Sequence, residues 1–363
     1  MASDLINLAA LSKAELQALT ARWGWSQYRA AQLWEWLYRR RAIAFDAMTN
    51  LSVEMRSELA RRACVRWPSV FERQTADDGT RKLLVELEDG RRIESVLIPD
   101  ERRLTLCLST QVGCTLDCGF CLTGTMGLIR NLKAYEIVGQ WVAAERELEF
   151  QPDGLPARLT NLVFMGMGEP LANLPQLAEA VTRLTDQHGI AFPPRRITVS
   201  TAGLVPHIAE LGRLTPAVNL AVSLNAADDA TRARIMPLAA RYPIKQIMAA
   251  CRAYPIAPRR YITFEYVLLD RVNDSDDDAR RLAALLRGLR AKVNLIPWNS
   301  FPGGPFQRPS DDRVARFQRI LLDRQVPTYV RKSKGREILA ACGQLHSAAS
   351  RAPAQPLSPL AFS

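Results

Sequence analysis

Three cysteines within eight residues form the group in this chain with the clearest capacity for chemistry. Cys114, Cys118 and Cys121 are spaced C-x3-C-x2-C in one short loop. A structural zinc site is closed by four ligands, and the chain's three histidines all lie elsewhere in the sequence. A [4Fe–4S] cluster held by three thiolates instead leaves one iron open to a further ligand. Zinc binding, a disulfide pair and chance spacing are the alternatives to a cluster at this loop.

Polar groups also follow several predicted strands. The stretch Gly166-Met167-Gly168-Glu169-Pro170 comes directly after an apolar strand at 161–165. Glycines permit a close approach of the backbone to a ligand, and a carboxylate or a free carbonyl there can hold an ammonium group. Three more strands end in polar groups, namely Ser200, the stretch Ser223-Leu224-Asn225, and Asn299. Each alone could be a turn or cap residue, but their shared place at strand ends favours a ligand site.

Strands and helices alternate from residue 104 onward. Short apolar runs predict buried strands at 104–109, 161–165, 196–200, 219–224, 262–268, 292–296 and 328–330. Helices are predicted between them, at 134–149, 174–187, 203–211, 228–236, 244–254, 275–289 and 310–324. This alternation indicates a parallel sheet. About six strand–helix units are fewer than the eight of a closed barrel. We therefore predict an α/β fold in which residues 104–346 form an open, partial (β/α)6 barrel, with its chemistry at the carboxyl ends of the strands.

Residues 1–68 are predicted to form a helical accessory domain. Ser12 and Glu15 make a capping box at the start of one helix, and Gly24 fits its end. Two further helices are predicted at 26–40 and from residue 52. The helical spacing of tryptophan and leucine in the second helix indicates a core, whereas the basic face of the third helix could contact RNA.

A strand-rich extension over residues 69–103 is predicted to join this helical domain to the barrel. Alternation with a period of two predicts strands at 71–75, 81–87 and 92–98. Asp78-Gly79 and Asp89-Gly90 are the turn signals between them. At the other end of the chain, the proline-rich residues 347–363 are predicted to be a disordered tail.

Composition narrows the class of protein. The chain has 363 residues, of which 48% are hydrophobic, and no apolar run approaches the length that spans a bilayer. No signal peptide is evident at the start, and an odd number of cysteines suits reduced thiols and metal in a cytoplasmic protein. The net charge is +11, and residues 280–351 carry 15 Lys and Arg against 4 Asp and Glu. A solvated basic surface is one interpretation, and a polyanionic partner such as nucleic acid is the other.

The cysteine loop follows an apolar strand and precedes a long helix, and in this context it resembles the radical S-adenosylmethionine (SAM) enzymes. The resemblance implies one [4Fe–4S] cluster on Cys114, Cys118 and Cys121, whose open iron chelates SAM. It also implies that the polar strand ends contact the bound SAM through Gly168, Glu169, Ser200, Ser223, Leu224, Asn225 and Asn299.

A narrower resemblance extends over roughly residues 10–346, to the bacterial ribosomal and transfer RNA adenine-C2 methyltransferases. Besides the cysteine loop it is carried by the stretches 93–99, 104–109, 164–170, 294–299, 330–332 and 341–345. One departure is Asn225, where the family often has histidine. An asparagine can still hydrogen-bond a ribose, so the contact is expected to remain.

The family's mechanism assigns three further residues in this sequence. Adenine C2 is an electron-poor carbon, so a carbon radical can add to it where a polar methyl transfer cannot. The resemblance implies that Cys342 is methylated first and presents the methyl carbon to C2, so that two SAM molecules are used per turnover. Glu94 matches the base that removes the C2 proton, and Cys107 matches the thiol that frees the product through a transient disulfide with Cys342. The basic residues near Cys342 predict a lowered thiol pKa.

The expected partners also follow from the resemblance. They are 23S ribosomal RNA at the peptidyl-transferase centre, tRNA next to the anticodon, and a reducing protein such as flavodoxin, the last by analogy only. We expect a cytoplasmic monomer with no membrane partner. The remaining cysteines, Cys64 and Cys251, match no motif and are read as structural.

Two other functions compete with this interpretation. The related adenine-C8 methyltransferases, which confer ribosomal antibiotic resistance, share nearly every motif, but they tend to be shorter in the N-terminal helical region. A basic RNA-binding protein with a structural iron–sulfur or zinc site and no turnover is the third hypothesis. Such a binding protein would need neither Cys107 nor Cys342.

Overall fold

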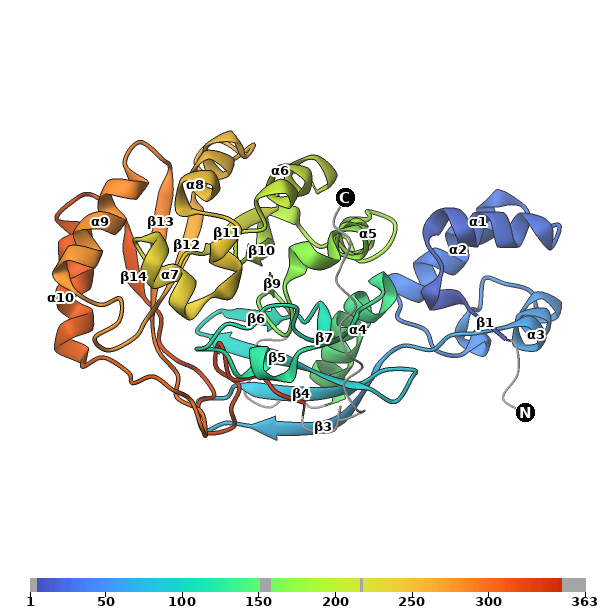
Figure 1. The fold of residues 1–363 in the computed structure, drawn as a ribbon. Helices are drawn as coiled ribbons and strands as arrows, with labels where there is room; N and C mark the ends of the chain where they lie inside the picture. The colour runs from blue at the N-terminus through green and yellow to red at the C-terminus, as the bar shows by residue number, and fades with distance from the viewer. Residues whose placement is uncertain (1–4, 151–157, 216–217, 348–363) are drawn as a thin grey trace.

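A ten-stranded sheet organises the chain in a computed structural model that describes residues 5–150, 158–215 and 218–347 (Figure 1). Seven strands are parallel: β6 (Arg103–Cys107), β9 (Asn161–Phe164), β10 (Ile197–Thr201), β11 (Asn219–Ser223), β12 (Ile262–Leu268), β13 (Ala291–Pro297) and β14 (Thr328–Val330). Each parallel strand pairs with the next one in this series, and β14 forms one edge of the sheet. The sheet is therefore open, as the strand pattern predicted.

Helices join the successive parallel strands. They are α4 (Ala134–Phe150), α5 (Leu174–Thr185), α6 (Val205–Leu214), α7 (Asp229–Ile235), α8 (Ile244–Ala253), α9 (Asp276–Leu286) and α10 (Asp311–Leu322). Figure 1 shows α5, α6, α8, α9 and α10 along the outer side of the curved row of strands. Local sequence sets where they begin: Asp228, Ser275 and Ser310 each accept a hydrogen bond from a backbone N–H in the first turn.

Three antiparallel strands extend the sheet beyond β6. They are β3 (Ser69–Thr75), β4 (Arg81–Glu86) and β5 (Arg92–Asp100), and β5 pairs with β6. The two predicted turns are confirmed: the Asp78 carboxylate accepts from the Thr80 N–H at 3.0 Å, and the Asp89 carboxylate from the Arg91 N–H at 3.1 Å. The predicted extension thus continues the same sheet as the barrel strands. The domain boundaries proposed from sequence stay a prediction, and the tail at 348–363 lies outside the described residues.

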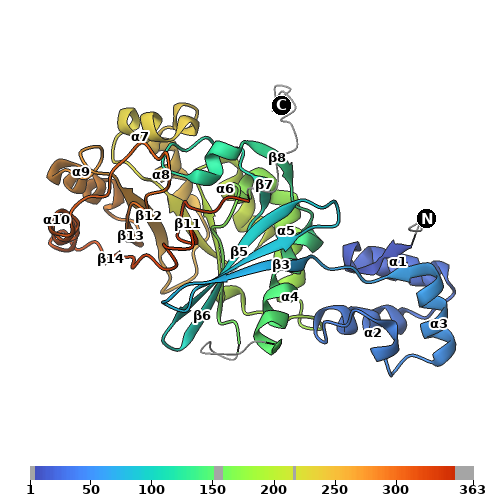
Figure 2. The same cartoon turned by 90° about the horizontal axis from the view of Figure 1, so that it is seen from below.

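The N-terminal helices form a unit beside the barrel, next to α4 and α5 (Figure 2). They are α1 (Lys13–Arg22), α2 (Gln27–Tyr38) and α3 (Val53–Arg62), and the capping box of Ser12 and Glu15 is present. Trp34 and its apolar neighbours on α2 are buried, which confirms that this stripe is core. A two-residue strand, β1 (Ile6–Asn7), pairs with β2 (Ala63–Cys64). Sequence did not predict this pair, because two residues give no period.

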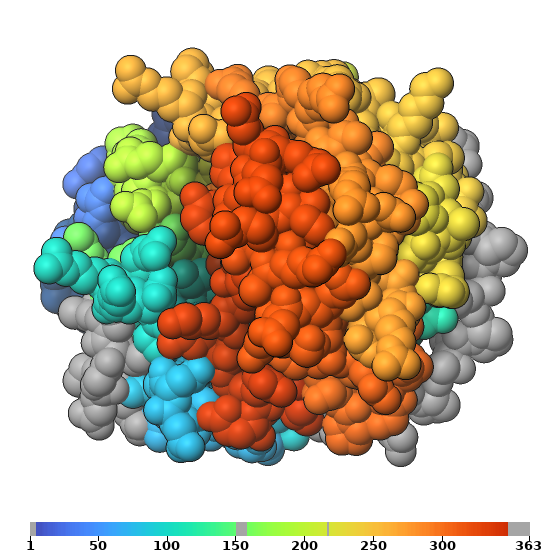
Figure 3. All heavy atoms as spheres, turned by 90° about the vertical axis from the view of Figure 1, so that its left-hand side faces the viewer, coloured from blue at the N-terminus to red at the C-terminus, as the bar shows by residue number. Residues whose placement is uncertain are grey.

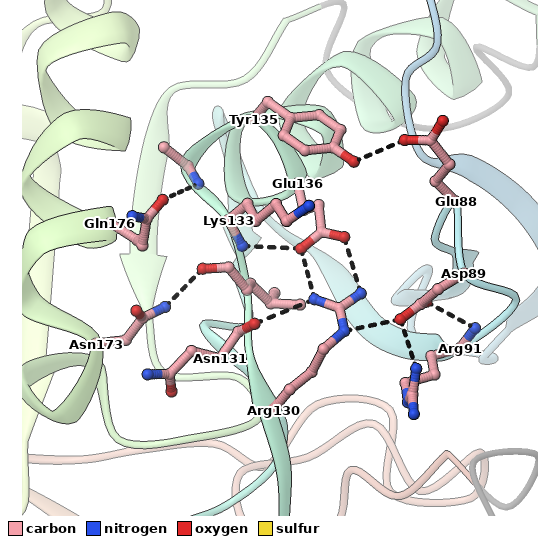
Figure 4. A network of polar contacts seen from close by, with 12 residues as sticks. Glu88, Asp89, Arg91, Arg130, Asn131, Lys133, Tyr135, Glu136, Asn173 and Gln176 are labelled. Carbon is pink, nitrogen blue, oxygen red and sulfur yellow. Dashed lines mark hydrogen bonds and ion pairs between the residues drawn. The ribbon is translucent and has the colours of Figure 1, made fainter. Parts of the chain in front are cut away.

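A small hairpin holds the cysteine loop, and sequence did not predict it either. Its strands β7 (Gln111–Gly113) and β8 (Leu128–Asn131) pair on either side of the loop. Arg130 on β8 donates to both carboxylate oxygens of Glu136 at 2.8 Å and to Asp89 at 2.8 Å (Figure 4). The same Glu136 accepts from the Lys133 N–H at the start of α4. One guanidinium therefore fixes the hairpin against the β4–β5 turn and α4.

No helix within the described ranges combines the length and the apolar character needed to cross a membrane.

The pairing of Asp89 predicts an acid-dependent loss of stability. Burial raises the pKa of Asp89, but hydrogen bonds from Arg130 and Arg91 outweigh it and hold the pKa at about 2, below the ordinary value of 3.8. A depressed carboxyl pKa stabilises the fold above the unfolded value, and this contribution is lost as the pH falls from 3.8 to about 2. Asp89→Asn should lower the free energy of unfolding at pH 6 by about 1 kcal/mol, a modest effect because solvent screens the pair.

Urea unfolding of both proteins between pH 6 and pH 2 checks this, because the difference between them should shrink below pH 4. Asp100→Asn is the matched control, since Asp100 is paired with Arg103 in a 53% exposed position and should contribute almost nothing. A constant difference between Asp89→Asn and the native protein across this range would contradict the assignment.

Candidate active site

One cavity lies at the carboxyl ends of the parallel strands, and it collects most of the side chains that the sequence singled out. The predicted residues on its wall are Cys114, Cys118, Cys121, Gly168, Glu169, Ser200, Ser223, Asn225, Asn299 and Cys342. Three predicted residues, Leu224, Glu94 and Cys107, do not line it. The cysteine loop and the strand ends, which are far apart in the chain, therefore meet as expected of parallel strands.

The cysteine loop is held from several sides. The Cys114 N–H donates to the carbonyl of Gly127 at 3.0 Å, which closes the base of the loop between β7 and β8. The Trp298 side chain, just after β13, donates to the carbonyl of Phe120 at 3.0 Å. The loop is thus fixed from its own hairpin and from the far side of the sheet, so its three thiols hold a defined arrangement.

The three thiols line one cavity and would suit a [4Fe–4S] cluster, which cysteine thiolates bind. Burial raises the pKa of the thiols of Cys118 and Cys121, and that of Cys114 to about 12. Thiolates at this loop therefore need a bound cation, which cluster iron supplies.

The segment 166–169 is hydrogen-bonded to the residues that lead into the cysteine hairpin. The Gly166 N–H donates to the Leu108 carbonyl at 3.0 Å, and the Met167 N–H to the Ser109 hydroxyl at 2.8 Å. A Cβ on Gly168, whose φ is +97°, would lie 2.6 Å from the Cβ of Gln111. The sequence explained these glycines by a close ligand. The structure shows that packing against neighbouring segments of the same chain already requires glycine at these positions.

Glu169 is buried on the cavity wall. Its two carboxylate oxygens accept from the backbone N–H groups of Leu171 at 3.0 Å and Ala202 at 2.7 Å. Burial raises its pKa, while these hydrogen bonds oppose the rise. The carboxylate therefore joins the 166–170 segment to the end of β10. A carboxylate has further lone pairs, so it can still accept from an ammonium group in the cavity.

Two hydroxyls and an asparagine lie at the ends of β10 and β11: Ser200 is in β10, Ser223 is the last residue of β11, and Asn225 follows β11. The hydroxyl oxygens of Ser200 and Ser223 lie 3.1 Å apart. Asn225 has a φ of +60°, a left-handed conformation that asparagine and histidine tolerate better than most residues. Its side-chain oxygen accepts from the Val267 N–H at 2.9 Å. Leu224, by contrast, packs in the core with no exposed surface. Its predicted contact with the cofactor stays a prediction.

Asn299 carries the clearest sign of a missing ligand. Its side chain is 2% exposed, and its Oδ1 has no hydrogen-bond partner, although it lies on the cavity wall. Its Nδ2 donates to the Cys342 carbonyl at 3.1 Å. A buried acceptor without a donor is costly, so the cavity is suited to a ligand with hydroxyl or amine donors, as in SAM.

Residues 331–347, here called the C-terminal strap, bring Cys342 to the cavity. The carbonyls of Gly343 and Leu345 accept from the Leu122 N–H at 2.7 Å and from the Thr123 hydroxyl at 2.6 Å, just after Cys121. The strap is therefore tied directly to the cysteine loop.

The strap is also tied to the β3–β4 hairpin. The Gly335 N–H donates to the Asp78 carboxylate at 3.0 Å, and the Asp77 N–H donates to the Glu337 carboxylate at 3.0 Å. Figure 3 shows strap residues in red-orange against the light blue hairpin. The antiparallel strands thus help to place a residue that follows the whole barrel in sequence.

The predicted lowering of the Cys342 pKa is wrong. The Cys342 residue as a whole is exposed and lines the cavity, but burial of its sulfur raises the pKa of the thiol, and the guanidinium of Arg331 offsets only part of the rise. The sequence argument counted basic neighbours in the chain, but only Arg331 among them acts on the thiol.

Glu94 and Cys107 lie behind the cavity wall, on β5 and β6. The Glu94 carboxylate is 3.1 Å from the Lys82 ammonium on β4 and accepts from the backbone N–H of His346 in the strap at 2.8 Å. Cys107 is 6% exposed. Burial raises its thiol pKa, and the charge of Cys342 raises it further. The disulfide between these two thiols stays a prediction.

Sequence reasoning missed Lys82, Glu265 and the direct role of Arg331. Glu265 lines the cavity from the middle of β12, where Asn294 donates to its carboxylate at 2.8 Å and burial raises its pKa. In the sequence, Glu265 could have been found as the single acidic residue inside the apolar stretch 262–268. Lys82 gave no such signal, because lysines are common in half-exposed strands.

Comparison with known proteins supports this site. Residues 108–283 match the family model for the radical SAM superfamily. A radical SAM methyltransferase from Sphaerobacter thermophilus has a similar structure, with a TM-score of 0.87 and 48% identity, covering 94% of this chain and 99% of that one. The fold and the cavity thus define a radical SAM enzyme.

Residues 6–65 match the model described as the ribosomal RNA large subunit methyltransferase N-terminal domain. The chain is 50% identical to the "Dual-specificity RNA methyltransferase RlmN" of Geotalea uraniireducens, over 91% of this chain and 94% of the relative. It is 49% identical to the protein of the same name from Geobacter sulfurreducens, over 94% of this chain and 92% of that one. The chain therefore belongs to the RlmN family of RNA methyltransferases.

The packing of Gly168 predicts a large cost for a single methyl group. Gly168→Ala combines a left-handed φ with a clash at Gln111, so it should lower the free energy of unfolding by about 3 kcal/mol. Gly24→Ala is the matched control, because Gly24 has a φ of +75° with no atom within 4 Å of the added Cβ, and it should cost only about 1 kcal/mol. Urea unfolding of both variants measures the difference. Equal losses would show that the segment moves away freely and that packing does not fix it.

Proposed function

We propose that the protein methylates C2 of adenosine in 23S ribosomal RNA, at the peptidyl-transferase centre, and in tRNA next to the anticodon. The observation that carries this proposal is the position of Cys342. The strap brings this thiol into the cavity of the cluster cysteines, beside Asn299, with Cys107 behind it. A binding protein has no use for such a pair of thiols. The match of residues 6–65 supports the C2-directed family over the C8-directed alternative.

The cavity residues assign the cofactors. Cys114, Cys118 and Cys121 would hold the [4Fe–4S] cluster. SAM would lie against the strand ends, at Gly168, Glu169, Ser200, Ser223, Asn225 and Asn299. When bound, these groups supply a methyl group and a 5′-deoxyadenosyl radical, two SAM molecules being used per turnover. The chain's part is to orient them, and Asn299 is placed to bind SAM with Oδ1 while holding the strap with Nδ2.

Cys342 is the proposed carrier of the methyl group. Its thiol must lose a proton before it can accept a methyl. Burial disfavours that loss, and the guanidinium of Arg331 favours it. Arg331 is therefore the residue that favours formation of the Cys342 thiolate. The same thiol faces the open cavity, where an adenine can approach it.

Glu94 and Cys107 complete the proposed chemistry. Glu94 takes the proton from C2, and its contacts with the Lys82 ammonium and the His346 N–H hold the carboxylate in place. Cys107, once deprotonated, attacks the sulfur of Cys342. A disulfide forms as the S–C bond to the product breaks, and the electron pair of that bond stays on the product carbon, which takes up a proton.

The role of Cys342 predicts a specific loss. Cys342→Ala should abolish methylation and leave the iron content unchanged, because the cluster ligands are other cysteines. Mass spectrometry of nucleosides from RNA, treated with the anaerobically reconstituted protein, SAM and a reductant, measures the product. The native protein should give 2-methyladenosine. Cys251→Ala is the control, since Cys251 is buried on α8 and outside the cavity, and it should retain activity.

The result distinguishes the alternatives. An 8-methyladenosine product would assign the protein to the C8-directed relatives. Methylation that survives in Cys342→Ala would refute the thiol carrier. No methylated adenosine despite a reducible cluster would mean that the substrate is wrong.

The basic surface predicts an affinity for RNA that depends strongly on salt. The chain carries a net charge of +11, and each phosphate contact releases counterions. The dissociation constant for tRNA should rise at least about tenfold between 50 and 200 mM salt. Fluorescence anisotropy with labelled tRNA measures this constant, and a flat response would show that electrostatics does not drive the recognition.

A flavodoxin-type reductant, a monomeric state and a cytoplasmic location complete the proposal by analogy with the family.

A further inference from the structure

Arg232 on α7 is a completely buried arginine that lies behind the cysteine loop. Its side chain has 0% exposed surface. Every hydrogen bond that it makes goes to a backbone carbonyl: Nε to Leu224 at 3.0 Å, Nη1 to Tyr242 at 3.2 Å and Nη2 to Ala202 at 2.5 Å. Leu224 and Ala202 follow β11 and β10, so the guanidinium bridges two strand ends of the cavity.

The positive charge of Arg232 has no carboxylate partner in contact with it. Among the described residues, no ion pair within 4.0 Å involves this guanidinium. Arg183, which is equally buried, donates to Glu179 at 2.8 Å, and Arg130 is paired with Glu136. A buried charge without a partner is expensive. The nearest acid on its own helix, Asp229, uses its carboxylate to cap the Ile244 N–H at 2.7 Å.

The helix that carries Arg232 lies against the cysteine loop beside Cys118. Burial lowers the pKa of Arg232 to about 10. The guanidinium is therefore charged at neutral pH. A backbone hydrogen bond joins the cysteine loop to α7: the Gly119 N–H donates to the Ile235 carbonyl at 3.1 Å. Cys118 itself packs against the apolar cluster that contains Ile235.

We propose that Arg232 is the counter-charge of the iron–sulfur cluster and a positioning residue for the loops around it. A [4Fe–4S] cluster with three thiolates is anionic, and reduction adds one more negative charge. A fixed cation nearby stabilises the reduced form more than the oxidised form, so it raises the reduction potential. The inference rests on cluster binding at Cys114, Cys118 and Cys121, and it is independent of the RNA substrate.

Neutral replacements of Arg232 test the charge. In the reconstituted full-length protein without RNA, Arg232→Met should lower the midpoint potential of the cluster by at least about 59 mV, which corresponds to a tenfold change in the equilibrium constant of a one-electron reduction. Redox titration followed by electron paramagnetic resonance measures it. Arg232→Lys keeps the positive charge but cannot make all three hydrogen bonds of the guanidinium to backbone carbonyls. Its midpoint potential should therefore stay closer to the native value than that of Arg232→Met.

Two further variants separate charge from structure. Arg183→Met also removes a buried arginine, but one that binds Ala9 and Tyr38 on the N-terminal unit, and it should leave the potential unchanged. Arg232→Gln is neutral and retains amide donors for the carbonyls, so it replaces the methionine variant if that protein does not fold. It should show the same fall in potential.

Two outcomes overturn the proposal. A native potential in either neutral variant with full iron content would make Arg232 a structural residue only. An equal fall of the midpoint potential in Arg232→Lys and Arg232→Met would show that the hydrogen bonds of the guanidinium set the potential, and not its charge. Because the readout needs no RNA, a failure here leaves the proposed methylation untouched, and a different RNA product leaves this inference untouched.

Discussion

The hydrogen bonds between the C-terminal strap and the cysteine loop are the contacts on which the rest of the site depends. Leu122 and Thr123 directly follow Cys121, and they hold the carbonyls of Gly343 and Leu345 on either side of the strap's turn. The two segments are more than 200 residues apart in sequence. The open sheet makes their meeting possible, because β14 ends at one edge and the strap can return across the strand ends to the antiparallel hairpin.

Burial dominates the electrostatics of this region. It raises the pKa of all three cluster thiols, of Cys107 and Cys342, and of the carboxyls of Glu169 and Glu265. The cavity therefore disfavours the anions that its chemistry requires. Cations offset part of this effect: Arg331 lowers the pKa of both Cys342 and Glu265, Lys292 also lowers that of Glu265, and Arg232 lowers that of Cys118. The charges of the site are therefore compensated locally.

Much of the scaffold could be predicted from sequence, because its signals are local. Apolar strands alternating with helices gave the parallel sheet, and the capping box of Ser12 and the turns at Asp78 and Asp89 formed as expected. The cysteine spacing and the polar strand ends marked the cavity wall. Among the features that could not be predicted are the hairpin of β7 and β8, the pairing of Lys82 with Glu94, and the raised thiol pKa of Cys342. These depend on contacts between segments that are separated in sequence, and a window of neighbouring residues does not contain them.

The two proposed redox thiols differ in access, and the difference suits their order of use. Cys342 faces the open cavity, whereas Cys107 lies in the core behind it. In the proposed reaction an adenine therefore meets Cys342 without touching Cys107. Burial and the charge of Cys342 raise the pKa of the Cys107 thiol. The proposal thus assigns the first contact with the substrate to Cys342 and leaves Cys107 for the later release step.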